Sequence, residues 1–349
     1  MDRPTVLLLF GGESPEHEIS ISSARNVYAA IDNARFNVLL GFIDRHGKWW
    51  LLDGLGEDIS PHGAPQLAPV LGSGSFVTFP SSRVVKPDVI LPILYGKNGE
   101  DGTVQGLAEL LHIPIVGCDV TASSICIDKL ATKEILRSND IKVVPYKSHN
   151  LGQPVPDFSK LSMTLGSPLL VKPSRAGNFL GSKVYSEEEL ARALEEAHKY
   201  SNAALIEAGI TARVLEVAVL GNPPRHQTTI AGEIKQEGEV HNYDEYGASS
   251  RSELMIPAQL EPGTMRAVRD LAARVYEILG CQGLAQVDLF LLEDDTIYLN
   301  EVNTLPGFTN TSMYAKLWRE EGISYAELIE RLIFLALGRE KELKETEEE

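Results

Sequence analysis

A short apolar run near the start of the chain, followed at once by two glycines, constrains the fold more than any other feature. Residues 5–10 read Thr-Val-Leu-Leu-Leu-Phe, and Gly11-Gly12 follows. Such a run is typical of a strand buried on both faces, as in parallel sheets covered by helices. Further strands are predicted at 37–43 and 88–94. We therefore predict a doubly wound α/β domain with a parallel sheet at the N-terminus.

A helix is predicted between the first two strands. Ser14-Pro15-Glu16 fits a helix start, because Ser caps, Pro suits the first turn and an acid is favourable at the positive helix end. The expected apolar stripe consists of Ile19, Ala24, Val27 and Ile31.

The rest of the chain has a different pattern, which predicts α+β units. Helices are expected at 121–138, 186–200, 264–279 and 325–337, the last ending at Gly338 before a solvated charged tail at 339–349. Strands are expected at 168–173, 204–207, 216–220, 228–235, 286–292 and 296–301. At about 150 residues per domain, the length predicts two or three domains.

Charge and composition narrow the classes of partner. The 349 residues hold 32 Lys and Arg against 49 Asp and Glu, a net charge of −17, which argues against a general affinity for nucleic acid or anionic membranes. No stretch approaches the roughly 20 apolar residues of a membrane span, and no signal peptide is evident, so we expect a cytoplasmic protein. The three cysteines form no CxxC pair and are expected to be buried, inert thiols.

The strongest chemical signal is a set of oxygen ligands on two late strands. Asp288 lies in one strand pattern, and Glu301 and Asn303 share a face of the next because side chains alternate along a strand. Two carboxylates and an amide suit Mg²⁺, and bound phosphate usually supplies the remaining ligands of such a site. A hydrogen-bonded polar pair at a strand end is the alternative. An acidic pair among apolar residues is costly without a cation, which favours the metal.

Two lysines are candidate phosphate contacts. Lys172 ends a buried strand and precedes the glycine-bearing turn 173–181, whose backbone N–H groups could face phosphate, although no P-loop is present. An ordinary hairpin explains the same turn. Lys129 lies on a predicted helix, where a solvated surface lysine is the default.

The loop after the first strand is rich in acids. Residues 11–18 contain three glutamates, which suit an ammonium group better than a pyrophosphate, although helix capping alone also explains them. The turn 96–102 is equally ambiguous. No HExxH, GxSxG or Cys/His pattern appears, and Trp49-Trp50 is expected to pack in the core.

Taken in order, these segments resemble the D-alanyl-D-alanine ligase family of ATP-grasp enzymes over essentially the whole chain. The matching stretches are 11–20, 95–106, 117–119, 128–129, 172–175, 288 and 299–309. The resemblance implies an ATP-grasp fold in which ATP and two Mg²⁺ ions, or Mn²⁺ in their place, convert one D-alanine carboxylate to an acyl phosphate that the amine of a second D-alanine attacks. It also implies three domains, at 1–118, 119–212 and 213–349, a role in peptidoglycan biosynthesis and a homodimer.

The resemblance also implies roles for individual residues of this chain, each assigned by its position in the matching stretches. It implies catalytic roles for Glu16, Asn178, Tyr246, Gln286 and Gly307, with Gly307 donating its N–H to the oxyanion. ATP would contact Lys129 and Lys172 through its phosphates and Glu207 through its adenine. The amino-acid substrates would contact Glu16, Tyr95 and Ser312, and the metal ions would be bound by Asp288, Glu301 and Asn303.

The departures from the family pattern fall on expected ligand contacts. Asn178-Phe179 replaces a Ser pair in the turn after Lys172, Gln286 replaces an Arg, and Tyr246-Gly247 stands where relatives carry Lys-Tyr. Others are Val214 for a ribose-binding Glu, Ala208 for a Lys and Tyr95 for a frequent His. Replacing Arg by Gln removes a charge and a bidentate donor from a carboxylate site.

Three functions are compatible with this pattern. The leading prediction is a ligase of this type, and the pattern leaves open whether its acceptor is D-alanine or another compound. A non-catalytic binding protein on the same fold is the rival, and a ligase of secondary metabolism with other substrates is the third. The intact metal-binding set and both lysines favour a catalyst.

Overall fold

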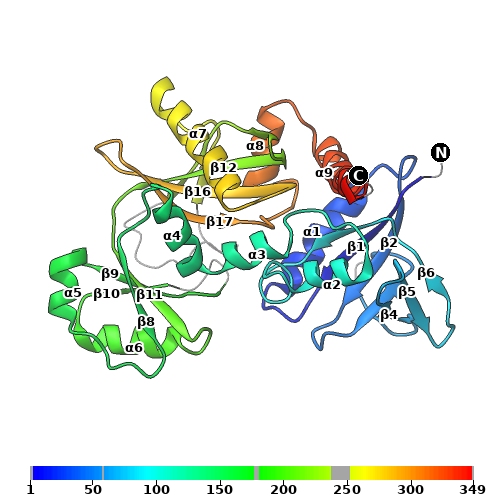
Figure 1. The fold of residues 1–349 in the computed structure, drawn as a ribbon, viewed down its shortest axis with the longest axis horizontal. Coiled ribbons are helices and arrows are strands. Elements are labelled where there is room, and N and C mark those ends of the chain that lie inside the picture. Colours follow the sequence, from blue (N-terminus) through cyan, green and yellow to red (C-terminus); the bar gives the residue numbers. More distant parts are fainter. Residues whose placement is uncertain (1–2, 57–58, 177–180, 237–251, 348–349) are drawn as a thin grey trace.

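The computed structural model describes residues 3–56, 59–176, 181–236 and 252–347, and three β-sheets organise them (Figure 1). The first sheet has the strand order β6-β5-β4-β3-β2-β1-β7. Its strands are β1 (Thr5–Gly11), β2 (Asn37–Ile43), β3 (Trp49–Leu52), β4 (Gln66–Val70), β5 (Ser75–Phe79), β6 (Val84–Val85) and β7 (Val89–Ile93). Only β2, β1 and β7 are parallel, and the remaining strands pair antiparallel. The parallel sheet is confirmed at its centre, but antiparallel strands extend it.

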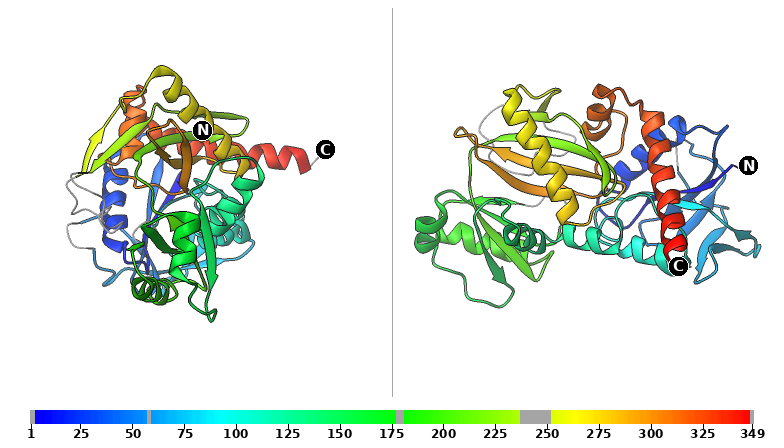
Figure 2. Two further views of the ribbon diagram at one scale, coloured as in Figure 1. Left: turned by 90° about the vertical axis from the view of Figure 1, so that its left-hand side faces the viewer. Right: turned by 45° about the horizontal axis from the view of Figure 1, so that its top comes forward.

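Helices cover both faces of this sheet, as the apolar run in β1 predicts. Val6, Leu8 and Phe10 join a core with α1 (His17–Ala30) and α9 (Tyr325–Glu347), whereas Leu7 and Leu9 join another with α2 (Thr103–Leu111). Figure 2 shows α9 lying beside the N-terminal sheet. Trp49 stacks on Phe76 with ring centroids 5.9 Å apart, so its predicted packing role is confirmed.

Two expectations for α1 are wrong. Its N-cap is Glu16, which makes no side-chain cap hydrogen bond, and Ser14 accepts instead from the Glu16 N–H at 3.1 Å. Ile19 is 42% exposed, and Ile21 takes its expected place in the core beside Ala24 and Val27. The helix therefore begins later than predicted, whereas Ala24, Val27 and Ile31 of the expected stripe are buried as predicted.

The second sheet has the order β10-β9-β11-β8 and carries two helices. Its elements are β8 (Tyr146–Asn150), α5 (Phe158–Leu165), β9 (Leu169–Pro173), β10 (Ser182–Val184), α6 (Glu187–Ala197) and β11 (Ala203–Ala208). Ser186 caps α6 by accepting from the Glu189 N–H at 3.3 Å. The predicted small α+β unit is present.

The third sheet is antiparallel, with the order β15-β14-β12-β16-β17 and β13 paired to β12. Its elements are β12 (Arg213–Asn222), β13 (Arg225–Thr228), β14 (Gly232–Gln236), β15 (Ser252–Met255), α7 (Pro262–Ile278), β16 (Leu284–Leu291), β17 (Ile297–Asn303) and α8 (Met313–Glu320). The single strand expected at 228–235 is thus two strands. Helix α7 packs on one face, in a core with Leu215, Val217 and Val287.

Two helices differ from prediction. The expected helix at 121–138 is broken into α3 (Val120–Ile127) and α4 (Lys129–Ser138), because the Asp128 carboxylate accepts from the N–H groups of Leu130 and Ala131 and starts a new helix. Helix α9 does not end at Gly338 but continues to Glu347, since the Glu, Lys and Leu residues that follow are strong helix formers.

All three cysteines are buried and free, as predicted. None of the helices in the described parts of the chain is long and apolar enough to span a membrane.

Candidate active site

Three carboxylates stand side by side on the face of the third sheet that points away from α7. Glu216 on β12 lies opposite Asp288 on β16, which lies opposite Glu301 on β17. A bulge places Glu301 there: Leu289 pairs with Leu299, so Asn300 is an extra residue between the two pairs. Bulges re-aim side chains in this way. Sequence reasoning predicted Asp288 and Glu301 but missed Glu216, although the alternation along β12 could have indicated it.

These carboxylates crowd one another in a buried environment. Burial, together with Glu216 and Glu301, raises the pKa of Asp288 well above its usual range. Burial and the charge of Glu301 raise the pKa of Glu216 to about 8. Ionising all three is therefore unfavourable unless a cation lies beside them.

The donors present fit a hard divalent cation. Asn303 lies opposite Gln286, two residues from the Asp288–Glu301 pair, so amide and carboxylate oxygens share this part of the sheet. Within the described residues, no three His, Cys, Asp or Glu side chains are placed to hold one metal ion. Ligands from outside the protein would have to complete the coordination shell.

Lys129 is not a solvated surface lysine. Its Nζ lies 3.1 Å from Glu301 Oε2, and both side chains are about one-tenth exposed. A small cavity brings the two together with Glu100 and Ala176 from two other segments, its lining being Glu100, Cys126, Ile127, Lys129, Ala176, Glu301, Val302, Asn303 and Thr304. A cation, a carboxylate pair and an amide thus converge on one cavity.

Glu100, which lines this cavity, has a further acid, Glu16, near it. Glu16, at the start of α1, packs against Gly96, where an added Cβ would lie 3.0 Å from Glu16 Oε2. Glu100 is buried, and its Oε1 accepts from the Gly96 N–H at 3.0 Å. Burial raises the pKa of Glu16, and burial followed by the charge of Glu16 raises the pKa of Glu100 to about 8. Glu100 was not a predicted site residue, because the turn 96–102 gave no distinctive signal.

The raised pKa of Glu100 predicts a loss of stability at alkaline pH. The folded state holds the Glu100 proton more tightly than the unfolded chain does, so protonation of Glu100 stabilises the fold. This stabilisation is fully present below about pH 4.5 and is lost as pH rises through about 8. Glu100→Gln keeps an acceptor for Gly96. Between pH 6 and 9, the metal-free wild type should lose roughly 2 kcal/mol more stability than this variant. Denaturant unfolding at each pH measures the free energy of unfolding. Glu109→Gln, on the exposed face of α2, is the control and should behave as the wild type does. If stability falls equally with pH in the wild type and in Glu100→Gln, the prediction is wrong.

Lys172 and Glu207 lie together, but in a separate buried cluster. Lys172 Nζ is 3.1 Å from Glu207 Oε2, and Lys133 Nζ from α4 is 2.7 Å from Glu207 Oε1. Burial opposes ionisation of Glu207, but the two lysines outweigh it and lower its pKa to about 2. Lys133 was not predicted as a site residue, although it lies four residues from Lys129 on the same face of α4.

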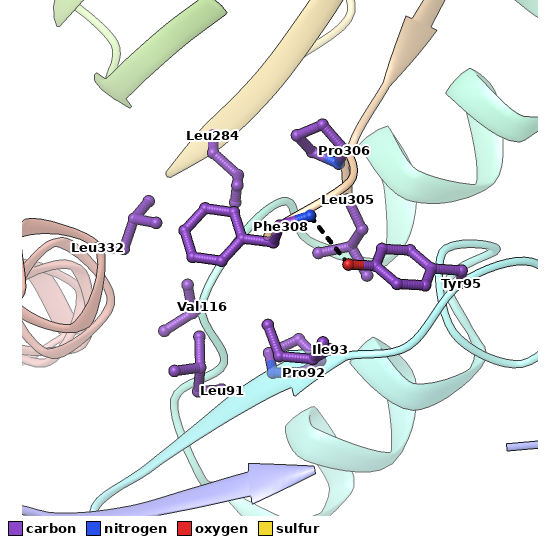
Figure 3. Close-up of a pocket in the computed structure, with 10 residues that line it drawn as sticks. All are labelled: Leu91, Pro92, Ile93, Tyr95, Val116, Leu284, Leu305, Pro306, Phe308 and Leu332. Atoms are coloured by element: carbon purple, nitrogen blue, oxygen red, sulfur yellow. Dashed lines mark hydrogen bonds between the residues drawn. The ribbon is translucent and has the colours of Figure 1, made fainter. Parts of the chain in front are cut away.

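Tyr95 is buried, and its hydroxyl group is already engaged. It donates to Ser23 Oγ and accepts from the Phe308 N–H, both at 3.0 Å. Figure 3 shows this hydroxyl meeting Phe308 at the edge of an apolar pocket between the first and third sheets. Tyr95 therefore fixes the segment that follows Gly307, rather than presenting its hydroxyl as a free substrate contact.

Removing this hydroxyl should loosen the Gly307–Phe308 segment. Tyr95→Phe leaves the buried Phe308 N–H without its acceptor, which costs about 1 to 3 kcal/mol. We expect a lower urea midpoint and slower turnover. Tyr185→Phe, at a tyrosine that is 55% exposed, should change neither. An unchanged urea midpoint for Tyr95→Phe would show that the hydrogen bond contributes nothing.

The remaining predicted residues divide into two groups. Gly307 and Ser312 lie close together, since a Cβ on Gly307 would meet Ser312 Oγ at 3.3 Å, and Gln286 Nε2 donates to Asp288 Oδ1 at 3.0 Å. Asn178 and Tyr246, with the neighbouring departures Phe179 and Gly247, lie outside the described residues.

Family models match most of the chain. The model described as D-ala D-ala ligase N-terminus matches residues 5–118, and the model described as D-ala D-ala ligase C-terminus matches residues 135–334. The D-alanine–D-alanine ligase A of Escherichia coli K12 is 39% identical over 359 residues, covering 97% of each chain. That of Chromobacterium violaceum is 40% identical, covering 97% of this chain and 96% of the relative.

Solved structures agree with these matches. The D-alanine–D-alanine ligase of Coxiella burnetii superposes with a TM-score of 0.88 at 30% identity, covering 99% of this chain and 97% of the other. The VanG D-Ala:D-Ser ligase of Enterococcus faecalis has a TM-score of 0.86 at 29% identity, covering 96% and 100%. The chain belongs to the D-alanine–D-alanine ligase family of ATP-grasp enzymes, so the predicted family and fold are confirmed.

Proposed function

We propose that this protein is an ATP- and Mg²⁺-dependent carboxylate–amine ligase that joins two D-amino acids. The observation that carries the proposal is the convergence of Lys129, Glu301 and Asn303 on one cavity, beside Asp288. In the reaction, a carboxylate oxygen of the first amino acid attacks the γ-phosphorus of ATP, and ADP leaves. The amine of the second attacks the acyl phosphate carbon, phosphate leaves and the amine loses a proton.

One group of residues would neutralise the negative charge of ATP. Asp288, Glu301 and Asn303 would hold two Mg²⁺ ions, or Mn²⁺ in their place, and such ions neutralise the transferred phosphoryl group when bound. Lys129 and Lys172 would contact the phosphates, and Glu207 would lie at the adenine.

The two amino acids would be held on the side of the cavity nearer the first sheet. Glu16 would bind the ammonium group of the first, because a half-buried carboxylate with a raised pKa gains from a cation. The Gly307 N–H would stabilise the oxyanion, with Tyr95 fixing the segment next to it. Ser312 would contact the carboxylate of the second amino acid, and Asn178 and Tyr246 would have catalytic roles.

The acceptor is the part of the proposal in which this chain differs from its relatives. Gln286 donates to Asp288 and carries no charge that could bind an acceptor carboxylate. We propose an acceptor bound less by its carboxylate than D-alanine is. The VanG D-Ala:D-Ser ligase of Enterococcus faecalis shares the fold, so the scaffold accommodates more than one acceptor.

A phosphate-release assay with ATP and Mg²⁺ tests this function. D-alanine is tried first, followed by other D-amino acids, D-lactate and simple amines, with the ligated product identified by mass spectrometry. Release with any of these supports a ligase. No release with all of them, together with no calorimetric binding of Mg·ATP, would favour a non-catalytic protein on the same fold.

The setting of this activity is part of the proposal. We propose that the enzyme acts in the cytoplasm as a homodimer, in the synthesis of a peptidoglycan precursor. We further propose three domains, at 1–118, 119–212 and 213–349, one for each of the sheets described above. Sedimentation and light scattering test the dimer.

A further inference from the structure

Three charged side chains form a buried row that the reaction as described does not fully use. Lys133 comes from α4, Glu207 from β11 and Lys172 from β9, and each has a side chain at most 4% exposed. Each carboxylate oxygen of Glu207 contacts a different lysine, at 2.7 Å for Lys133 and 3.1 Å for Lys172. A buried carboxylate with a cation on each side is an arrangement that proteins build only with matched geometry.

The charges of this row do not cancel. Glu207 carries one negative charge, and the two lysines carry two positive charges, which leaves one positive charge for the cluster. If Lys133 were absent, Glu207 and Lys172 would form a neutral pair. A neutral pair attracts a phosphate much less than a cluster with one net positive charge does, because the fields of the pair nearly cancel at the distance of a ligand.

Besides Glu207, Lys133 contacts a backbone carbonyl and an aromatic ring. Its side chain is 2% exposed, its Nζ also contacts the Val144 carbonyl at 3.4 Å, and the Tyr146 ring covers it with the Nζ 5.5 Å from the ring centroid. Any effect of Lys133 on a bound nucleotide therefore passes through Glu207 and Lys172.

We propose that Lys133 is a positioning residue that neutralises Glu207 and so leaves the charge of Lys172 available to the phosphates of the nucleotide. The inference rests on the proposed binding of ATP. It also explains why α4 carries lysines four residues apart: Lys129 faces Glu301, and Lys133 faces Glu207.

A double-mutant cycle tests the proposal. Lys133→Met keeps the volume and removes the charge, and should weaken Mg·ATP binding by about tenfold or more. Adding Glu207→Gln removes the charge that now cancels Lys172, so the double variant should recover ATP affinity to near that of Glu207→Gln alone. Adenosine, which has no phosphates, should bind equally well to the wild type and to Lys133→Met. Calorimetry on the full-length chain measures both ligands.

The outcomes separate this inference from the proposed function. If the wild type binds no Mg·ATP, the proposed function is wrong. If the wild type binds and Lys133→Met binds equally well, or if the second substitution deepens the loss, Lys133 does not act through charge. Equal losses for ATP and adenosine would indicate a packing role and overturn the inference. Lys133→Arg keeps the charge and should retain ATP affinity. Lys160→Met, on the exposed face of α5, is the matched control. If Lys133→Met does not fold, Lys133→Gln takes its place.

Discussion

Glu301→Ala should lower turnover by about a thousandfold or more while the protein stays folded. A metal ion at this site would neutralise the phosphate and lower the activation free energy by several kcal/mol. Each 1.36 kcal/mol corresponds to a factor of ten in rate. Glu301 lies beside both Lys129 and Asp288, so removing it takes away a proposed metal ligand. It also relieves repulsion with Asp288 and Glu216, which limits the cost to stability.

The experiment compares this variant with Glu293→Ala, at an exposed position on the β16–β17 connection. Phosphate release gives the rate, and thermal unfolding with and without Mg²⁺ shows whether the ion still stabilises the protein. We expect Mg²⁺ to raise the melting temperature of the wild type and of Glu293→Ala but not of Glu301→Ala. Near-normal turnover in Glu301→Ala would refute the metal assignment.

Gln286→Arg should improve the use of D-alanine as acceptor by one to two decades. A charged hydrogen bond to a carboxylate is worth about 1.5 to 3 kcal/mol, which corresponds to that change in affinity. Gln286 is buried next to Asp288, so an arginine would also pair with a carboxylate whose pKa is raised. The expected effect is on the KM for the second D-alanine rather than on the KM for ATP.

Two companion variants sharpen this test. Gln286→Met removes the hydrogen bond to Asp288 without adding charge and should give no improvement. Gln286→Lys adds a charge without the planar fork of arginine and should give a smaller gain than arginine does. An unchanged KM for the second D-alanine in Gln286→Arg would place the acceptor carboxylate elsewhere.

The fold could be predicted from local patterns because each pattern depends on neighbours in sequence. The apolar run of β1 and the shared face of Glu301 and Asn303 are of this kind. The break at Asp128 was missed because a helical periodicity does not show which aspartate will accept from the next N–H groups.

The site could be predicted only in part, because much of it depends on contacts between distant segments. Glu216 becomes significant only once β12 is known to lie next to β16, and Lys133 only once α4 lies over β11. The resemblance supplied Lys129 and Lys172, which the residue pattern alone left open. No pattern in the sequence gives the burial that raises the pKa of Glu100.

The packing of α9 has a consequence for how the chain is made. One face of the first sheet, formed by residues near the N-terminus, is covered by Leu328, Leu332 and their neighbours in α9. A ribosome delivers those residues long after β7. The N-terminal sheet therefore emerges with an apolar face that α1 covers only in part. A chain cut short before α9 should yield an aggregating N-terminal fragment rather than a stable domain.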